Sequence, residues 1–402
     1  MLPCRLRYWR SIFFSFIVTL LMFNSTSYAN EEGDESPQDS IQVTAPLTLE
    51  SEVIVPDTLW RTADSEDGID EDSIGEEHVG EENANKEDAE APTMALTPAP
   101  PLEPPPSKNI TLMLDWYLSP QHAALIIAQQ RGYYAAQGLV VDIQSPADPS
   151  IAIKLLSAGE VDLALTRQPL LHLHAHDGAP ITRIATLIET SLTAVIIAGE
   201  EQVGNDKALA ELHYGYTTRE GLELSIPRLL PRSVRQMDDF LPPENLNFDP
   251  ARALREKQAD AIADGFFHYL PPQLATEGIT THLIRFEALD IPRLDGLIVL
   301  ANSDSLTRRA DTWSRFTLAL EEASHWIIDH PDAAWALLIA THPVLDNDIN
   351  AAAWEDILRR MALSPAALDS RRYSAFEAYL QKRGIIDNTL PVSRLAVDPH
   401  AL

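Results

Sequence analysis

Cysteine and basic residues are the two kinds of side chain that this 402-residue sequence has little of. Its single cysteine, Cys4, lies in an N-terminal stretch that we expect to be removed, so the mature chain has no disulfide, thiolate or cysteine metal site. Only 30 lysines and arginines stand against 60 aspartates and glutamates, for a formal charge of −30. A nucleic-acid-binding protein needs a basic face, so that class of function is excluded.

Apolar runs long enough to cross a membrane are also missing. The N-terminal run Ile12–Phe23 has 12 residues, whereas a membrane-spanning helix needs about 20. Three arginines precede this run and Ser27-Tyr28-Ala29 follows it, which is the pattern of a signal peptide. An uncleaved anchor is the alternative. We expect residues 1–29 to direct export to a bacterial periplasm and to leave a chain that does not span the membrane.

Residues 30–107 have the composition of a linker. They hold 22 acidic and two basic residues, few large apolar side chains, and seven prolines between Pro92 and Pro106. Like charges repel one another, and so few apolar groups cannot offset the entropy lost on folding. We therefore expect a disordered acidic segment that ends in an extended, proline-rich spacer.

From residue 108 onward, short apolar runs alternate with patterns of helical spacing. The expected strands are residues 110–114, 139–143, 161–165, 181–188, 193–198, 212–216, 234–240, 260–263, 279–286 and 297–301. The expected helices are residues 121–131, 150–157, 249–257, 271–277, 307–329, 332–341, 347–361 and 365–382, the last of them beginning at Ser364-Pro365. This alternation predicts an α/β fold with mostly parallel strands.

The order of these elements divides the folded part into two lobes. Residues 108–199 and 296–402 form the first lobe together with the C-terminal helices, and residues 200–295 form the second. In open parallel sheets, ligands bind beyond the carboxyl ends of the strands. We therefore expect a cleft between the lobes, lined by the residues that directly follow the strands.

Several motifs at these positions match a known family. They include Leu114-Asp115-Trp116 with His122, Ala158-Gly159-Glu160-Val161-Asp162, and Asn247-Phe248-Asp249-Pro250-Ala251. With them the chain resembles the SsuA/THI5-like solute-binding proteins of ABC transporters, and within them the receptors for a thiamine pyrimidine precursor. The resemblance implies a two-lobed type II periplasmic binding protein, acting as a monomer without a cofactor, that delivers a small solute to an ABC permease.

The chemistry of an aminopyrimidine points to particular side chains. Its flat ring needs an aromatic face, and its amine and ring nitrogens need a carboxylate or amide. The candidate ligand-binding residues are Asp115, Trp116, His122, Gln168, Ser191, Tyr216, Thr217, Glu220, Asp264 and Phe267.

Structural roles remain open for several of these candidates. Trp116 could fill the lobe core, Asp115 could cap a loop, and His122 could cap or pack at a helix start. Phe266 and Phe267 suit a core. Three histidines at positions 172, 174 and 176 suggest zinc, but helical spacing places only two of them on one face, and we expect no metal site.

Alternative functions follow from the same resemblance. A receptor for a sulfonate or taurine-like anion predicts that Arg167 or Arg219 faces the cleft. The family also contains a pyrimidine synthase that uses a pyridoxal-phosphate lysine, and Thr166 occupies the matching position here. A Schiff base needs an amine, so we expect no enzyme activity. A degenerate receptor that binds an envelope partner is the third alternative, because Ala124, Ile126 and Leu270 depart from the family pattern and leave the solute open.

Overall fold

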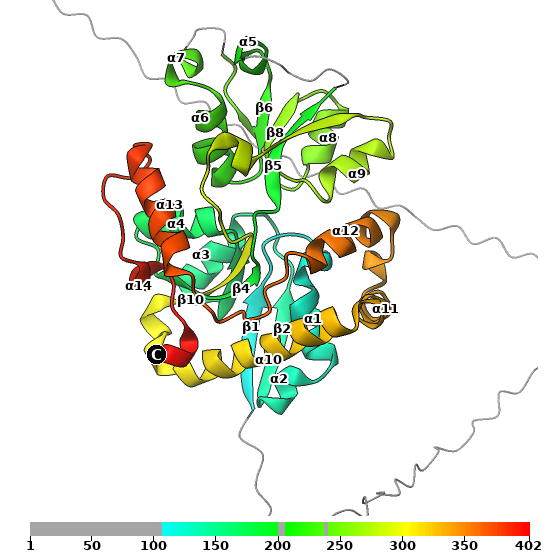
Figure 1. Cartoon of the computed structure of the whole chain (residues 1–402), viewed down its shortest axis with the longest axis vertical. Helices are drawn as coiled ribbons and strands as arrows, with labels where there is room; N and C mark the ends of the chain where they lie inside the picture. The colour runs from blue at the N-terminus through cyan, green and yellow to red at the C-terminus, as the bar shows by residue number, and fades with distance from the viewer. Residues whose placement is uncertain (1–106, 200–205, 237–239) are drawn as a thin grey trace, which may run out of the picture. The chain divides into compact units, whose positions relative to one another are not determined.

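The computed structural model describes residues 107–199, 206–236 and 240–402. The expected signal peptide and almost all of the expected linker lie outside the described residues. The described part forms two five-stranded sheets with helices on both faces, as Figure 1 shows. No helix within it is both long and apolar enough to cross a membrane.

The first sheet contains β1 (Lys108–Met113), β2 (Leu139–Gln144), β3 (Leu163–Thr166), β4 (Ile181–Ile188) and β10 (Leu297–Asn302), in the order β2-β1-β3-β10-β4. Strand β10 runs antiparallel to both neighbours, and β1 pairs in parallel with β2 and β3. Successive side chains of β10 enter opposite cores, since Leu297 and Val299 pack on one face and Ile298 on the other. This period of two explains the continuous apolar run, because a strand covered on both faces has no polar side.

The second sheet repeats this arrangement. It contains β5 (Thr193–Ala198), β6 (Tyr214–Tyr216), β7 (Glu244–Asn245), β8 (Ala261–Phe266) and β9 (Thr281–Arg285), in the order β7-β6-β8-β5-β9. Here β5 is the antiparallel strand, between β8 and β9. In each sheet, the antiparallel strand is the one that follows a crossing from the other sheet.

The helices divide between the two sheets. Those of the first lobe are α1 (Ala123–Gln130), α2 (Tyr133–Ala136), α3 (Ile151–Ala158), α4 (Gln168–His176), α10 (Ala310–Asp329), α11 (Pro331–Thr341), α12 (Asp348–Leu358) and α14 (Val392–Leu395). Those of the second lobe are α5 (Asp206–Ala210), α6 (Ile226–Leu229), α7 (Arg232–Arg235), α8 (Pro250–Arg255) and α9 (Leu270–Ala275). Short turns of tighter or wider helix include Pro120–His122 and Gly221–Ser225.

The boundary between the lobes lies earlier than the sequence suggested. The expected boundary placed residues 193–198 in the first lobe, but these residues form β5 and pair with β8 and β9 of the second sheet. The short segment 189–192 already carries the chain across from β4. The expected return of residues 297–301 to the first sheet is confirmed, because β10 pairs with β3 and β4.

The two crossing segments touch at Gly296. Its amide donates to the carbonyl of Ile188 at 2.8 Å, and a Cβ at this position would lie 2.0 Å from the carbonyl oxygen of Thr190. No side chain fits between two backbones at that distance.

We expect Gly296→Ala to lower the free energy of unfolding by about 1–3 kcal/mol, measured by urea denaturation. Gly159→Ala serves as a control, since no heavy atom lies within 4 Å of a Cβ there. Gly159 has a left-handed backbone, so Gly159→Ala costs some stability through backbone strain but none through a clash. A loss in Gly296→Ala that is no larger than the loss in Gly159→Ala would contradict the clash.

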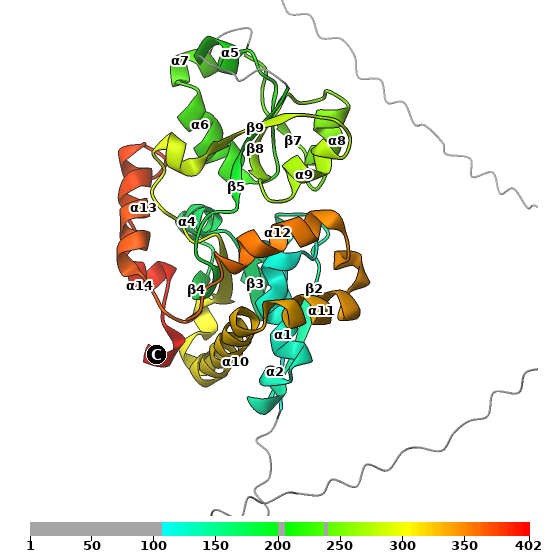
Figure 2. The same cartoon turned by 45° about the vertical axis from the view of Figure 1, so that its right-hand side comes forward.

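Helix α13 (Ser370–Lys382) packs against both lobes, as Figure 2 shows. Tyr373 belongs to a core of the first lobe, whereas Phe376 and Leu380 belong to a core of the second. The sequence predicted that this helix begins at Pro365, and that prediction is wrong. The carbonyl groups of residues 365–367 accept hydrogen bonds from the buried guanidinium of Arg183, and Asp369 caps the helix instead.

The strand expected at residues 234–240 is also not observed. Residues 232–235 form the helical turn α7, and Val234 packs from it against a core of the second lobe. Residues 237–239 lie outside the described part of the chain. One apolar side chain in a helical turn is enough to reach this core, so the apolar residues here did not require a strand.

Candidate functional site

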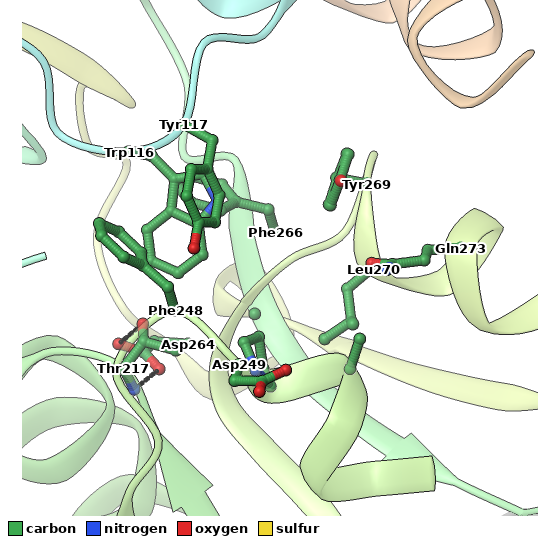
Figure 3. A pocket seen from close by; sticks show the side chains of 13 residues that line it. Trp116, Tyr117, Thr217, Phe248, Asp249, Asp264, Phe266, Tyr269, Leu270 and Gln273 are labelled. Carbon is green, nitrogen blue, oxygen red and sulfur yellow. Dashed lines mark hydrogen bonds between the residues drawn. The ribbon is translucent and has the colours of Figure 1, made fainter. Parts of the chain in front are cut away.

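A hollow lies where two aromatic side chains of the first lobe meet the second lobe. It has about 530 Å³ of space free of protein atoms, part of which is open to solvent. Trp116 and Tyr117 lie beyond β1, and every other lining residue belongs to the second lobe, as Figure 3 shows. The second-lobe residues are Thr217, Phe248, Asp249, Pro250, Ala251, Asp264, Gly265, Phe266, Tyr269, Leu270 and Gln273.

Aromatic rings form one wall of the hollow. The indole of Trp116 meets the ring of Phe248 edge to face with centroids 4.5 Å apart, and that of Phe266 at 5.4 Å. Tyr117 lies 4.5 Å from Phe248 and is half exposed. Trp116 is only 8% exposed, but its indole packs on second-lobe rings and borders the free space, so it is not sealed inside the first lobe. Such a wall offers flat, apolar surface for a planar solute.

Asp264 lies at the floor of the hollow and is almost fully engaged. Its carboxylate accepts hydrogen bonds from the amides of Thr217 and Thr218, both at 2.8 Å, and from both hydroxyls, at 3.0 and 2.7 Å. The first role of this carboxylate is to hold the turn after β6 in place. One oxygen accepts only the Thr217 amide, and the whole side chain is buried.

Other polar groups at the rim are less engaged. The Asp249 carboxylate is exposed and pairs with Arg252 at a separation of 3.5 Å. Tyr117, Tyr269 and Gln273 bring further hydroxyl and amide groups to the lining. No arginine, lysine or histidine lines the hollow. The site therefore offers carboxylates, hydroxyls and an amide, and no positive charge.

Asp115 and His122 form a buried pair beside the hollow rather than in its wall. The Nδ1 atom of His122 accepts the Ser119 amide at 3.1 Å, so Nε2 carries the proton and donates to Asp115 at 3.0 Å. Ser119 and His122 together form a capping box at the start of the helical turn before α1. This geometry favours the capping role that the sequence left open for His122, whereas Asp115 accepts from the side chains of His122 and Gln121.

Several other candidates also lie outside the lining. Gln168 is fully buried; its side-chain oxygen accepts the Asp295 amide at 2.8 Å. Ser191 bonds to Thr193 at 2.9 Å, and Tyr216 packs against a second-lobe core. The ring of Phe267 faces the guanidinium of Arg285, 3.9 Å away.

Of the lining residues, the sequence candidates included only Trp116, Thr217 and Asp264; Phe248, Tyr269 and Gln273 are among those it missed. Phe248 follows β7, which has only two residues and gives no recognisable strand pattern. Tyr269 and Gln273 belong to the start of α9. Phe248 belongs to the family motif Asn247-Phe248-Asp249-Pro250-Ala251, directly before the start of α8 at Pro250. That motif was the signal that could have identified it.

Glu220 lies behind the floor of the hollow in an ion pair between the lobes. Its carboxylate is 2.9 Å from Nε of Arg167, and the second oxygen accepts the Thr193 hydroxyl at 2.9 Å. Burial raises the pKa of the Glu220 carboxyl, and the Arg167 guanidinium opposes that rise. Arg219 pairs with Asp177 and Glu223. Both arginines that an anionic solute would use are thus engaged by carboxylates.

The histidines of α4 share a carboxylate. His172 donates from Nδ1 to Glu377 at 2.6 Å, and His176 contacts the same carboxylate at 3.0 Å. Within the described residues, no group of three or more metal-ligating side chains is present. The cluster joins α4 to α13, and burial lowers the pKa of His172.

Comparisons with known proteins show the family to which the chain belongs. The family described as NMT1/THI5 like matches residues 119–334. A Haemophilus influenzae protein whose name assigns it to thiamine biosynthesis is 33% identical over 295 residues, which cover 72% of this chain and 92% of that protein. A formylaminopyrimidine-binding protein of Halalkalibacterium halodurans is 25% identical, with 58% and 70% covered.

Enzymes and sulfonate receptors are among the similar proteins too. A 4-amino-5-hydroxymethyl-2-methylpyrimidine phosphate synthase of Saccharomyces cerevisiae is 24% identical over 60% of this chain and 74% of its own. The alkanesulfonate-binding protein SsuA from Xanthomonas axonopodis has the same fold, with a TM-score of 0.55, 16% identity, and 72% and 98% of the two chains covered. The family profile spans more than half of the chain, and the Haemophilus relative extends over most of it. The chain belongs to the NMT1/THI5-like family and has the fold of periplasmic binding proteins.

Proposed function

We propose that this protein is an exported receptor that captures a thiamine pyrimidine precursor, an aminopyrimidine, between its two lobes. The observation that carries the proposal is the composition of the hollow, which has an aromatic wall, a carboxylate floor and no basic residue. A planar ring can lie against the aromatic wall, and its amine can donate to a carboxylate or hydroxyl oxygen. The names of the two bacterial relatives agree with this class of solute.

The proposal extends to location and partners. The N-terminal pattern of arginines, a short apolar run and Ala29 supports export to the periplasm. Receptors of this fold include ligand-binding components of ABC import systems. We propose that the protein acts there as a monomer and delivers its solute to an ABC permease, with closure of the lobes controlled by solute contacts.

Calorimetric titration tests the proposal directly. We expect 4-amino-5-hydroxymethyl-2-methylpyrimidine or its formylamino counterpart to bind with a dissociation constant in the micromolar range, about −8 kcal/mol. Alkanesulfonates should give no comparable heat, because Arg167 and Arg219 are already paired. A sulfonate that binds more tightly than either pyrimidine would contradict the proposal. No binding by any solute would favour the degenerate receptor.

The synthase relatives make enzyme activity the second candidate. Thr166 ends β3 at the position where the resemblance predicts a lysine in the enzyme branch. A hydroxyl cannot form the imine that an amine forms with pyridoxal phosphate. We therefore expect no pyridoxal absorbance in the purified protein and no turnover of a pyrimidine precursor. An imine absorption band would favour the enzyme.

Asp249 provides a more local prediction. Its exposed carboxylate lies at the rim of the hollow and is paired with the exposed Arg252 at 3.5 Å. We expect Asp249→Asn to weaken aminopyrimidine binding by about three- to tenfold, since solvent screens an exposed charge. Calorimetry measures the change. Asp142→Asn is a matched control, because Asp142 is exposed on β2 outside the lining; equal losses in both variants would contradict a contact at Asp249.

A further inference from the structure

Arg167 reaches from the first lobe into the second. It follows β3 and precedes α4, yet the partners of its guanidinium belong to the other lobe. Nη2 donates to the hydroxyl of Thr218 at 2.7 Å, and Nε lies 2.9 Å from the carboxylate of Glu220. The nearest oxygen of Asp264 is 3.7 Å from Nη2. The arginine side chain is 6% exposed, so its charge is buried and satisfied without a solute.

The Glu220 carboxylate lies in a set of donors that would suit an anionic solute. Oε2 lies 2.9 Å from Nε of Arg167 as an ion pair without an aligned hydrogen bond, and Oε1 accepts the hydroxyl of Thr193 at 2.9 Å. Ser191 contacts the same threonine hydroxyl at 2.9 Å. An arginine with flanking hydroxyls is the usual way to bind a carboxylate or sulfonate. Here the bound carboxylate is part of the chain.

This occupied site adjoins the hollow. The guanidinium of Arg167 lies over the ring of Phe266, with its central carbon 5.3 Å from the centroid, and Phe266 lines the hollow. Asp264 belongs to both sites. A solute in the hollow is therefore separated from the guanidinium by one ring and one carboxylate.

An anionic solute would have to displace Glu220 to reach this arginine. The competing carboxylate is tethered, so its effective concentration at the site is high. Displacement would also leave the buried Glu220 carboxylate without Arg167 as its partner, and an unpaired buried charge is costly. A neutral solute needs neither step. Glu220 thus bears on which solutes the cleft accepts, even though it does not line the hollow.

We propose that Arg167 and Thr193 form an anion-binding subsite that the chain fills with its own Glu220 carboxylate, and that Glu220 thereby selects against anionic solutes. The selectivity part of this proposal rests on the proposed function of the hollow. The subsite itself depends only on the ion pair and hydroxyl contacts between the lobes.

Two substitutions of Glu220 distinguish the effect of vacating the volume of its carboxylate from the effect of removing its charge. Glu220→Ala removes the carboxylate and leaves the volume that it filled empty, so a small anion can take its place beside Arg167. Glu220→Gln removes the charge but fills the volume, and is the matched control. We expect acetate or methanesulfonate to bind Glu220→Ala at least tenfold more tightly than the wild type, by calorimetry. Both anions should raise its thermal midpoint more than equimolar chloride does.

The additional substitution Arg167→Gln should abolish the gain. Affinity for acetate and methanesulfonate that is equal in Glu220→Ala, Glu220→Gln and the wild type would overturn the proposal. If circular dichroism shows that Glu220→Ala is unfolded, Glu220→Ser carries the same expectation. The proposed function is tested separately with 4-amino-5-hydroxymethyl-2-methylpyrimidine on the wild type. If the wild type does not bind the pyrimidine, a gain of anion binding in Glu220→Ala would still support the subsite. If the wild type binds the pyrimidine but Glu220→Ala gains no anion binding, only the proposed subsite is contradicted.

Discussion

Trp116→Ala should weaken aminopyrimidine binding by about 100-fold, the largest loss expected from one side chain. The indole joins the lobes, because it comes from the first and packs edge to face on Phe248 and Phe266 of the second. Its removal takes away the stacking surface, worth about 0.5–1.5 kcal/mol beyond burial. It also removes apolar area buried when the lobes close, at about 25 cal/mol per Å². Calorimetric titration of the folded variant measures the loss.

Two further variants make this result specific. Trp116→Phe keeps an aromatic face, so the loss should stay below about tenfold. Trp326→Ala removes an equally large ring from α10, where it stacks on His330 and under Arg131, outside the lining of the hollow. Its affinity should match that of the wild type. Unchanged binding in a folded Trp116→Ala protein would remove the hollow as the solute site.

Acidification should destabilise the protein through His268. This residue follows β8 in the second lobe, is buried, and has no hydrogen-bond partner for Nδ1. The charged groups around it belong to the first lobe, namely Asp356, Arg360, Asp115 and His122. Burial lowers the pKa of His268 from 6.5 to about 4. The imidazole is therefore neutral in the folded protein over most of the physiological range.

The direction of the pH effect follows from this lowered pKa. Above pH 6.5 the imidazole is neutral in the folded and unfolded states, so its full contribution to stability is present. As the pH falls from 6.5 toward 4, the unfolded chain binds a proton that the folded chain does not, and unfolding becomes easier. We expect a loss of about 3 kcal/mol in the free energy of unfolding across this interval, from the spacing of the two pKa values.

The contribution of His268 is isolated by comparison with a variant. Urea denaturation at several pH values should show a smaller loss for His268→Gln than for the wild type. Burial also lowers the pKa values of His172 and His174, so only the difference between the two proteins reports on His268. Parallel pH profiles would show that His268 is already exposed to solvent, or protonated, in the folded protein. Solute affinity should fall over the same interval if opening of the lobes exposes this histidine.

Much of the fold was predictable because it depends on local patterns. Residues 181–188 and 193–198 form strands with the expected bounds, since apolar runs between turn residues suit strands buried on both faces. The start of α13 was not predictable. Ser364-Pro365 has the local pattern of a helix start, but the buried Arg183, far away in the sequence, takes the carbonyl groups of the following residues.

The candidate site was predictable only in part. Trp116, Thr217 and Asp264 line the hollow, as their positions after strands suggested. Position after a strand did not separate them from Gln168 and Glu220, which also follow strands but bond to other segments of the protein. The side chain of each was expected to face a solute, and each instead satisfies a buried group from another element. A strand end brings a residue near the cleft without fixing the direction of its side chain.

The amino-acid sequence by itself determined the α/β character, the strands and helices with regular patterns, the lack of cysteine chemistry in the folded part and the family resemblance. These depend on side-chain period and composition, which are local. Only the tertiary structure decided that Phe248 joins the aromatic wall, that α13 packs on both lobes and that Glu220 neutralises Arg167. A buried charge or ring takes its partner from whatever the fold brings within a few ångströms, and the partners of Arg167 lie about 50 residues or more away along the chain.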